Sequence, residues 1–431
     1  MERFLLILIC AVSGFSAQAQ LTLDECQTRA HDNYPLIKQY GLIEQSTEYS
    51  ITNAAKAYLP QVALSAQATY QSDMAAFPEK MTSLYQQIGV DMKGLNKDQY
   101  KMALEVNQTI WDGGLTRAQK DVSTAEGQVS AQTIETELYN LRERINGLYF
   151  GILILNEQIR QNTLLQELLQ SNYAIAEACV KNGVAMQSDL NSIKAEQLTV
   201  AQQRTQIESA SDAYRRMLSV MTGQPIPESA TFDKPAPTVA LPSPSNNSNN
   251  RPELQYYSAQ TAYLEAQKRA VLASTMPKIG VFAQGFYGNP GLNLFKDMTE
   301  DRWTWNYIAG LRLQWNFGSF YTKKGNIQKL TLAQQQTDNR RETFLYNNNL
   351  QQIQQQNAIE KMQKVMTDDD EIIRLRHSIR IASEAKYANG AITVNDLLHD
   401  VTTENQAALN KSLHELEWLK TIYELKYTRN N

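Results

Sequence analysis

The sequence predicts a mainly helical fold with a small β part, in which long antiparallel coiled-coil-like helices accompany four extended strands. The first observation is that the 431 residues include only 12 Pro and 19 Gly, so that long stretches lack helix-breaking residues. The second is an internal repeat that divides the chain into two similar halves. The third is that each half contains two segments of alternating apolar and polar residues, which is the period of a β-strand.

Residues 1–19 have the pattern of a secretory signal peptide. Arg3 and the amino terminus supply positive charge, residues 4–12 are apolar, and Ala17-Gln18-Ala19 fits the small-residue cleavage signal. We therefore expect the mature protein to begin at Gln20.

Three matches in the same order indicate two structural halves. The matched pairs are Glu177–Leu190 with Glu384–Leu397, Leu59–Tyr70 with Met276–Tyr287, and Trp111–Arg117 with Phe317–Lys323. We assign residues 20–222 to the first repeat and residues 252–431 to the second, each in the order helix, β-hairpin, long helix and returning helix. Residues 223–251 are rich in Pro, Asn and Ser, and we expect them to form a solvated linker.

Each half begins with a helix of medium length, at about 24–57 and about 252–275, and continues into a β-hairpin that is opened by Pro60 or Pro277. The first strands and the return strands alternate apolar residues with polar or small ones. The apolar positions are Val62, Leu64, Ala66, Ala68 and Tyr70 with Met102, Leu104, Val106 and Ile110 in one half, and Ile279, Val281, Ala283 and Tyr287 with Leu311, Leu313, Trp315 and Phe317 in the other.

A very long helix follows each hairpin, at about 115–181 and about 324–388. In the first, a heptad seam predicts coiled-coil packing. The seam consists of Ile134, Leu138, Leu141, Ile145, Leu148, Ile152, Leu155 and Ile159. The chain is expected to turn at Asn182-Gly183 and at Asn389-Gly390, because Asn-Gly supplies the left-handed residue that ends a helix. Returning helices then occupy about 186–222 and about 392–427.

The strands are long enough to cross a lipid bilayer, since about 10–13 residues suffice when a strand is tilted. Aromatic residues lie near their ends, as at membrane interfaces. Four strands cannot close a barrel, and unpaired strand edges are costly in lipid. We therefore expect a barrel that is shared between chains; the alternative is a soluble four-stranded sheet that caps a coiled coil.

The sequence resembles the TolC-type outer-membrane efflux family over essentially the whole mature chain. The most specific shared parts are Leu21–Glu25 with Asn33-Tyr34-Pro35, the strand entry Tyr58-Leu59-Pro60, the strand exit Trp111–Gly114, and the paired turns. The resemblance implies a homotrimer in the outer membrane of a Gram-negative bacterium. Each protomer would give four strands to one β-barrel in the lipid, and the helices would form a periplasmic α-barrel.

The resemblance also implies partners. Such a channel docks onto a periplasmic adaptor, also called a membrane fusion protein, and onto an inner-membrane transporter. The assembly is a tripartite efflux or type I secretion system that exports small molecules or proteins. A pore-less periplasmic helical scaffold or adaptor is the alternative, although an adaptor would have one helical hairpin flanked by lipoyl-like β segments.

The family carries a gate at the helical turns. The resemblance implies a latch between Tyr387, just before the second turn, and Asp189, just after the first. A second latch would use a hydroxyl at Ser188 and an Arg at the position of Ile392, so this second latch is predicted to be missing. The simpler interpretations are that Asp189 caps its helix and that Tyr387 is a packing residue.

The family also places acidic residues after the second turn, where they form a cation-selective ring. Asp396 matches the first position, and the second is His399, with Asp400 beside it. Copies of Asp396 around one axis would focus a negative potential, and a protonated His399 would weaken it. Asp396 as a helix cap and His399 as a plain turn residue are the alternatives. The acidic run 367–371 is either a solvated face or helix restart, or a negative ring.

Composition excludes several other classes. The formal charge of −4 and pI of about 5.8 give no general attraction to nucleic acid. The mean hydropathy of −0.46 excludes a polytopic helical membrane protein. The four His form no close metal-binding pair and no catalytic motif is present, so we expect no enzyme, cofactor or metal. Cys26 and Cys179 are distant and are expected to be free thiols.

Overall fold

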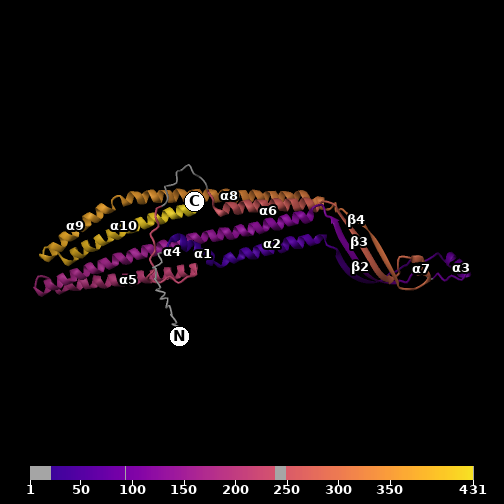
Figure 1. Cartoon of the computed structure of the whole chain (residues 1–431), viewed down its shortest axis with the longest axis horizontal. Helices are drawn as coiled ribbons and strands as arrows, with labels where there is room; N and C mark the ends of the chain where they lie inside the picture. Colours follow the sequence, from indigo (N-terminus) through magenta and orange to yellow (C-terminus); the bar gives the residue numbers. More distant parts are fainter. Residues whose placement is uncertain (1–20, 93, 238–248, 431) are drawn as a thin grey trace, which may run out of the picture. The chain divides into compact units, whose positions relative to one another are not determined.

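The computed structural model describes residues 21–92, 94–237 and 249–430, which divide into two compact units. Within the described chain, the helical unit takes in residues 21–40, 132–255 and 341–430, and the sheet unit takes in residues 41–131 and 256–340. Figure 1 labels the elements of both units. The predicted signal peptide, residues 1–19, lies outside the described residues.

Two helical hairpins make up most of the helical unit. The first consists of α4 (Leu115–Lys181), which enters this unit at residue 132, and α5 (Gln187–Thr222). The second consists of α9 (Asp369–Ala388) and α10 (Val394–Arg429). Within the unit, α9 lies beside α10 (Figure 1). Side-chain hydrogen bonds join α4 to α5, such as the one from Gln197 to Gln170 at 3.0 Å. The short α1 (Leu23–Asn33) begins at Thr22, whose hydroxyl accepts the Glu25 N–H at 3.3 Å and caps the helix.

The core of this unit forms along the predicted heptad seam of α4. Ile145 and Ile152 are fully buried, and Ile134, Leu138, Leu141 and Leu148 are at most 8% exposed. Leu416 and Leu419 of α10 and Leu23 and Cys26 of α1 pack against the same stripe. The prediction of coiled-coil packing is therefore confirmed for this part of α4.

Part of the predicted linker is packed rather than solvated. Phe232 forms a parallel β-bridge with Leu21, in which the Leu21 N–H donates to the Thr231 carbonyl at 3.0 Å and the Asp233 N–H donates to the Leu21 carbonyl at 3.0 Å. The Tyr149 hydroxyl, from α4, lies 2.7 Å from the carbonyl oxygens of Leu21 and Asp233. The short segment around Phe232 thus anchors the chain at Leu21 to the core.

Two predicted helices are interrupted. The helix expected at about 24–57 breaks at Pro35, which lacks the N–H that a helix interior needs, into α1, a 3-10 turn at Pro35–Lys38, and α2 (Gln39–Ala55). The helix expected at about 324–388 breaks at Thr367 and Asp368 into α8 (Ser319–Met366) and α9. The acidic first turn of α9 favours a new helix start at this point, as in the helix-restart interpretation of the acidic run.

The sheet unit contains one four-stranded antiparallel sheet in the order β1-β2-β3-β4. Its strands are β1 (Gln61–Tyr70), β2 (Asp98–Trp111), β3 (Lys278–Asn289) and β4 (Thr304–Gln314). The central pair β2-β3, in which Met102 lies opposite Tyr287, joins the two halves of the chain. Since β4 ends at Gln314, Trp315 and Phe317 lie beyond the strand in which they were predicted.

Shorter elements complete this unit. The loop between β1 and β2 contains α3 (Glu79–Gln87), and the loop between β3 and β4 contains α7 (Leu294–Thr299). A 3-10 turn at Lys56–Tyr58 leads into β1, and α6 (Pro252–Ser274) leads into β3. A mainly helical fold with a small β part is therefore confirmed. Among the helices that the structure describes, none has the length and apolarity to cross a bilayer.

Both remaining cysteines are free. Cys26 is fully buried in the core of the helical unit, and Cys179 is half-buried near the end of α4. Burial raises the pKa of the Cys26 thiol to about 11, with a smaller contribution from Glu25, so this thiol is protonated and unreactive at neutral pH. The prediction that the two cysteines form no disulfide is confirmed.

Candidate functional site

One face of the sheet is apolar and open. Because successive side chains alternate between the faces, the strand register places the predicted apolar positions together on it. The exposed side chains include Leu64 (64%), Tyr307 (83%) and Leu311 (79%). Others on this face are Val62, Met102, Leu104, Trp305 and Leu313. The largest apolar side chains of the strands therefore lie on an uncovered surface.

The opposite face is polar and more enclosed. It presents Lys101 and Glu105 from β2, Gln284 from β3 and Arg312 from β4. Lys101 Nζ donates to Gln284 Oε1 at 3.1 Å, and the Arg312 guanidinium lies 3.7 Å from Glu105 Oε1. Phe286 on the same face is only 4% exposed.

This arrangement is the reverse of a sheet in water. A soluble antiparallel sheet packs its apolar face on a core and turns its polar face to solvent. A strand that crosses an outer membrane turns its apolar side chains to lipid and its polar ones to an aqueous lumen. The exposed apolar face and the enclosed polar face therefore favour the membrane interpretation over a soluble sheet that caps a coiled coil.

The strand entry and strand exit that carry the family resemblance contact each other directly. The Tyr58 hydroxyl donates to Asp112 Oδ1 at 2.8 Å. The Asp112 carboxylate also accepts the Gly114 N–H at 3.0 Å and the Thr116 N–H at 2.7 Å, and so caps the start of α4. Asp112 is 5% exposed. The two motifs together fix the hairpin to the helix that follows it.

The two predicted turns have the same local structure. Gly183 (φ +74°) and Gly390 (φ +68°) occupy the left-handed region that favours glycine. In each turn the N–H of the residue after the glycine returns to the helix: Val184 donates to the Cys179 carbonyl and Ala391 to the Lys386 carbonyl, both at 2.9 Å. This pattern is a Schellman-type helix ending. Asn182 and Asn389 precede the two glycines, as predicted.

The structure brings Tyr387 and Asp189 near each other without a direct hydrogen bond. Tyr387 is 6% exposed in a cluster with Ile193 and Leu397, and its hydroxyl has no partner among the described residues. Burial and then the Asp189 carboxylate raise the pKa of Tyr387. Asp189 Oδ2 accepts the Met186 N–H at 3.1 Å and so caps α5. Ser188 is exposed on the first turn of α5.

The three candidate ring residues have different surroundings. Asp396 is exposed, and its Oδ2 accepts the Thr393 N–H at 3.0 Å and the Thr393 hydroxyl at 2.7 Å; these bonds lower the pKa of Asp396. His399 is exposed one turn later. Asp400 is half-buried and accepts the Ser383 hydroxyl at 2.6 Å, so its carboxylate joins α10 to α9. Asp396 and His399 thus share a solvent-exposed surface that Asp400 only borders.

The comparisons with known proteins agree with this geometry. The family model described as outer membrane efflux protein matches residues 28–224. VceC from Vibrio cholerae is 13% identical, with a TM-score of 0.68 over 95% of this chain and 96% of that one. CmeC from Campylobacter jejuni is 13% identical, with a TM-score of 0.65 over 94% and 85%. MtrE from Neisseria gonorrhoeae, an outer membrane channel in an open state, is 15% identical, with a TM-score of 0.65 over 95% and 89%.

The sequence therefore resembles the outer membrane efflux protein family, as predicted. The family match lies in the first half of the chain, and the fold similarity extends over both halves. No curated protein matches the sequence. These similarities confirm the predicted resemblance and fold class, and they support an outer membrane channel.

The chain also contains a row of polar and ionic side-chain contacts between α9 and α10 that sequence reasoning missed. His414 Nδ1 lies 2.9 Å from Asp369 Oδ2, and His377 Nδ1 lies 2.7 Å from Glu404 Oε1. Lys411 pairs with Asp370, and Arg380 pairs with Glu404. In the α4–α5 hairpin, neutral contacts join the helices, such as the Asn162 side chain donating to the Val200 carbonyl at 3.0 Å. The acidic run 367–371 thus contributes to helix pairing.

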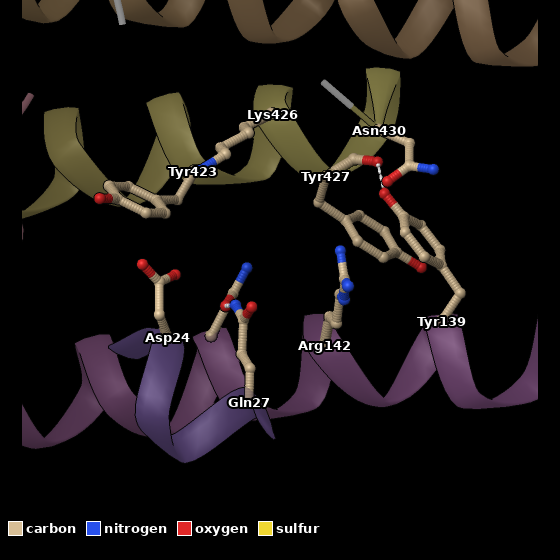
Figure 2. Close-up of a pocket in the computed structure, with 9 residues that line it drawn as sticks. Asp24, Gln27, Tyr139, Arg142, Tyr423, Lys426, Tyr427 and Asn430 are labelled. Carbon is tan, nitrogen blue, oxygen red and sulfur yellow. Dashed lines mark hydrogen bonds between the residues drawn. The ribbon is translucent and has the colours of Figure 1, made fainter. Parts of the chain in front are cut away.

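A small pocket lies between α1, α4 and α10 (Figure 2). The Tyr139 and Tyr427 rings stack at 4.8 Å, and the Tyr139 hydroxyl donates to the Tyr427 carbonyl at 2.5 Å. Arg142 and Lys426 point toward the pocket from opposite sides. Its volume of about 40 Å³ holds only a few water molecules and no organic ligand.

Proposed function

We propose that three copies of this chain form one channel, in which each protomer contributes its four strands to a closed barrel across the outer membrane. The helices form a periplasmic duct that leads to the barrel. A periplasmic adaptor and an inner-membrane transporter complete the export system, and the transporter supplies the energy. The channel itself has no catalytic role, and the exported molecules are small compounds or proteins.

The exposed apolar face and the enclosed polar face of the sheet support this proposal, and so do its unpaired edges. Its strands β1 and β4 lie at the edges of the four-stranded sheet and pair with no further strand of the described chain. In lipid, each unpaired edge would leave a row of backbone N–H and C=O groups without partners, which costs several kcal/mol per group. Pairing β4 of one copy with β1 of the next removes both edges. A pore-less scaffold in water would instead leave the large apolar face without a function.

The test combines assembly and conductance. The purified full-length protein in planar bilayers should give single-channel currents, and crosslinking in cells should give a trimer in the membrane fraction. Recovery of the protein as a monomer in the soluble periplasm, without detergent, would support the scaffold instead. Co-purification of crosslinked partners would identify the adaptor and the transporter.

We further propose that Tyr387 and Asp189, with Ser188 beside them, form a latch that holds the turns at Asn182-Gly183 and Asn389-Gly390 closed. The buried Tyr387 hydroxyl without a partner, with a carboxylate close enough to raise its pKa, supports the proposal. In the closed channel the hydroxyl would donate to Asp189, a bond to a charged group worth about 1.5–3 kcal/mol. Ile392 cannot supply a second latch.

The Tyr387→Phe variant is expected to increase single-channel conductance, because it removes the hydroxyl that the latch requires. Tyr173→Phe, on α4 of the same cluster, is the matched control and should leave the conductance unchanged. If Tyr387→Phe and Asp189→Asn both conduct like the parent protein, Tyr387 is a packing residue only.

We also propose that Asp396, with His399 and Asp400 beside it, contributes to a negative constriction ring. Asp396→Asn is expected to lower the cation-to-anion permeability ratio by about twofold or more, because the ring loses its focused charge. Thr393→Ala removes the cap hydroxyl and keeps the charge, so it should leave the ratio unchanged. Equal effects of the two substitutions would mean that Asp396 acts only as a helix cap. Reversal potentials in a salt gradient measure the ratio.

A further inference from the structure

The polar face of the sheet carries an excess of positive charge. Its charged side chains within the strands are Lys101 of β2, Lys278 of β3 and Arg312 of β4, against the single carboxylate of Glu105. The net charge of this face is therefore +2 per protomer. A narrow lumen with low-dielectric walls concentrates such a potential and attracts the opposite charge.

Lys101 has no acidic partner in the part of the chain that the structure describes. Its ammonium lies 4.3 Å from the centre of the Phe286 ring and donates to the neutral Gln284 amide at 3.1 Å. Both contacts stabilise the ammonium without neutralising it. Lys101 thus presents an uncompensated charge on the enclosed face.

Arg312 forms a similar pair with a second ring. Its guanidinium lies 4.6 Å from the centre of the Phe282 ring, and its side chain is 54% exposed. The ion pair with Glu105 is long, at 3.7 Å. The Phe282 ring packs against Gly310 of β4, where a Cβ would meet it at 3.1 Å. The sheet therefore holds a half-buried aromatic ring beside a cation that remains accessible.

A basic side chain next to a half-buried aromatic ring can bind a solute that has both a negative charge and an aromatic group. An anion that carries an aromatic group can pair its charge with Arg312 and place its ring against Phe282, while Lys101 adds positive charge to the same face. A cation of the same shape would be repelled by both basic groups, and a small inorganic anion would gain only the charge interaction.

We propose that the polar face of the sheet forms a transit site for aromatic organic anions, built from Arg312, Phe282 and Lys101. This inference rests on the proposed function, because it requires that the polar face line the lumen of the assembled barrel. Glu105 weakens the site and keeps it from trapping its solute, which must also leave.

The probe is 2-naphthalenesulfonate, added to single channels of the full-length protein in planar bilayers. It should reduce the current at millimolar concentration. In the double variant Lys101→Gln with Arg312→Gln, the concentration of 2-naphthalenesulfonate that halves the current should be about tenfold higher. Lys80→Gln on the exposed α3 is the matched control, and the probe should block this variant at the same concentration as the parent. A naphthyl-trimethylammonium cation should block all of them weakly and equally.

Phe282→Leu separates the ring from the charge. It should weaken the block by 2-naphthalenesulfonate about threefold and leave the reversal potential in a salt gradient unchanged. Equal block in the parent, the double variant and Phe282→Leu would overturn the site while the observed currents still support the channel. Complete absence of currents from the parent protein would instead contradict the proposed function.

Discussion

The Leu64→Arg variant is expected to lose most of its insertion into the outer membrane, whereas the adjacent Ser65→Arg variant is expected to insert normally. Leu64 lies in the middle of β1 on the apolar face, and Ser65 lies on the polar face. An arginine on the lipid face near the middle of a bilayer costs about 2–4 kcal/mol per strand, and a trimer would carry it three times. An arginine in the lumen stays hydrated.

This pair of variants distinguishes a membrane sheet from a soluble one because both residues are exposed in the protomer. On a sheet surrounded by water, the two substitutions should behave alike. The measurement is the amount of heat-resistant trimer in outer-membrane fractions, compared with the total protein. Equal amounts for Leu64→Arg and Ser65→Arg would contradict the assignment of the apolar face to lipid.

The Asp112→Ala variant is expected to destabilise the sheet unit by about 2–4 kcal/mol. The buried carboxylate accepts hydrogen bonds from the Tyr58 hydroxyl and from the N–H groups of Gly114 and Thr116, and its loss leaves all three donors without a partner. Tyr58→Phe, which removes one donor, should cost about 1 kcal/mol. Glu79→Ala, at an exposed position of α3, should stay within about 0.5 kcal/mol of the parent.

The pH dependence of this contribution has a defined sign. Burial raises the pKa of Asp112, but hydrogen bonds from Thr116, Tyr58 and Gly114 outweigh it and lower the net pKa below the ordinary value of 3.8. A carboxyl with a depressed pKa in the folded state stabilises the fold fully above its unfolded-state pKa and loses this effect as the pH falls through the folded-state pKa. The stability difference between the parent and Asp112→Asn should therefore be constant near neutral pH and shrink below pH 3.8. A difference that does not change with pH would mean that shape, and not charge, matters at Asp112.

Local patterns predicted most of the fold. The heptad seam gave the buried face of α4, the alternation of residues such as Leu64 and Leu104 gave the two faces of the sheet, and the Asn-Gly pairs gave both turns. These features depend on neighbours within a few residues along one helix or strand, so the sequence contains them directly.

Features that depend on the register between distant elements were missed. The pairing of His414 with Asp369 requires the axial offset of α10 against α9, which no single helix specifies. The same holds for Arg251, at the end of the predicted linker, whose guanidinium lies 4.7 and 4.6 Å from the centres of the stacked Tyr139 and Tyr427 rings and bonds Glu253 at 2.9 Å. Pro35 was visible as a helix breaker, and the continuous periodicity on both sides of it concealed the break.

The sites were predicted through the resemblance rather than through chemistry. Nothing in the local sequence says that the Tyr387 hydroxyl lacks a partner or that Asp400 bonds Ser383. Lys101, Phe282 and Arg312 come from three strands in both halves, and only the pairing of β2 with β3 and of β3 with β4 brings them to one surface.

The interruption at Thr367 and Asp368 makes the two repeats mechanically unequal. In the helical unit α4 is continuous, so a twist applied at one end of it reaches the other end with little loss. The corresponding segment of the second repeat has a joint between α8 and α9, where the regular helical hydrogen bonds give way to those of a turn. Alongside this joint α10 alone is continuous, so the second repeat resists bending there through α10 and its contacts with α8 and α9.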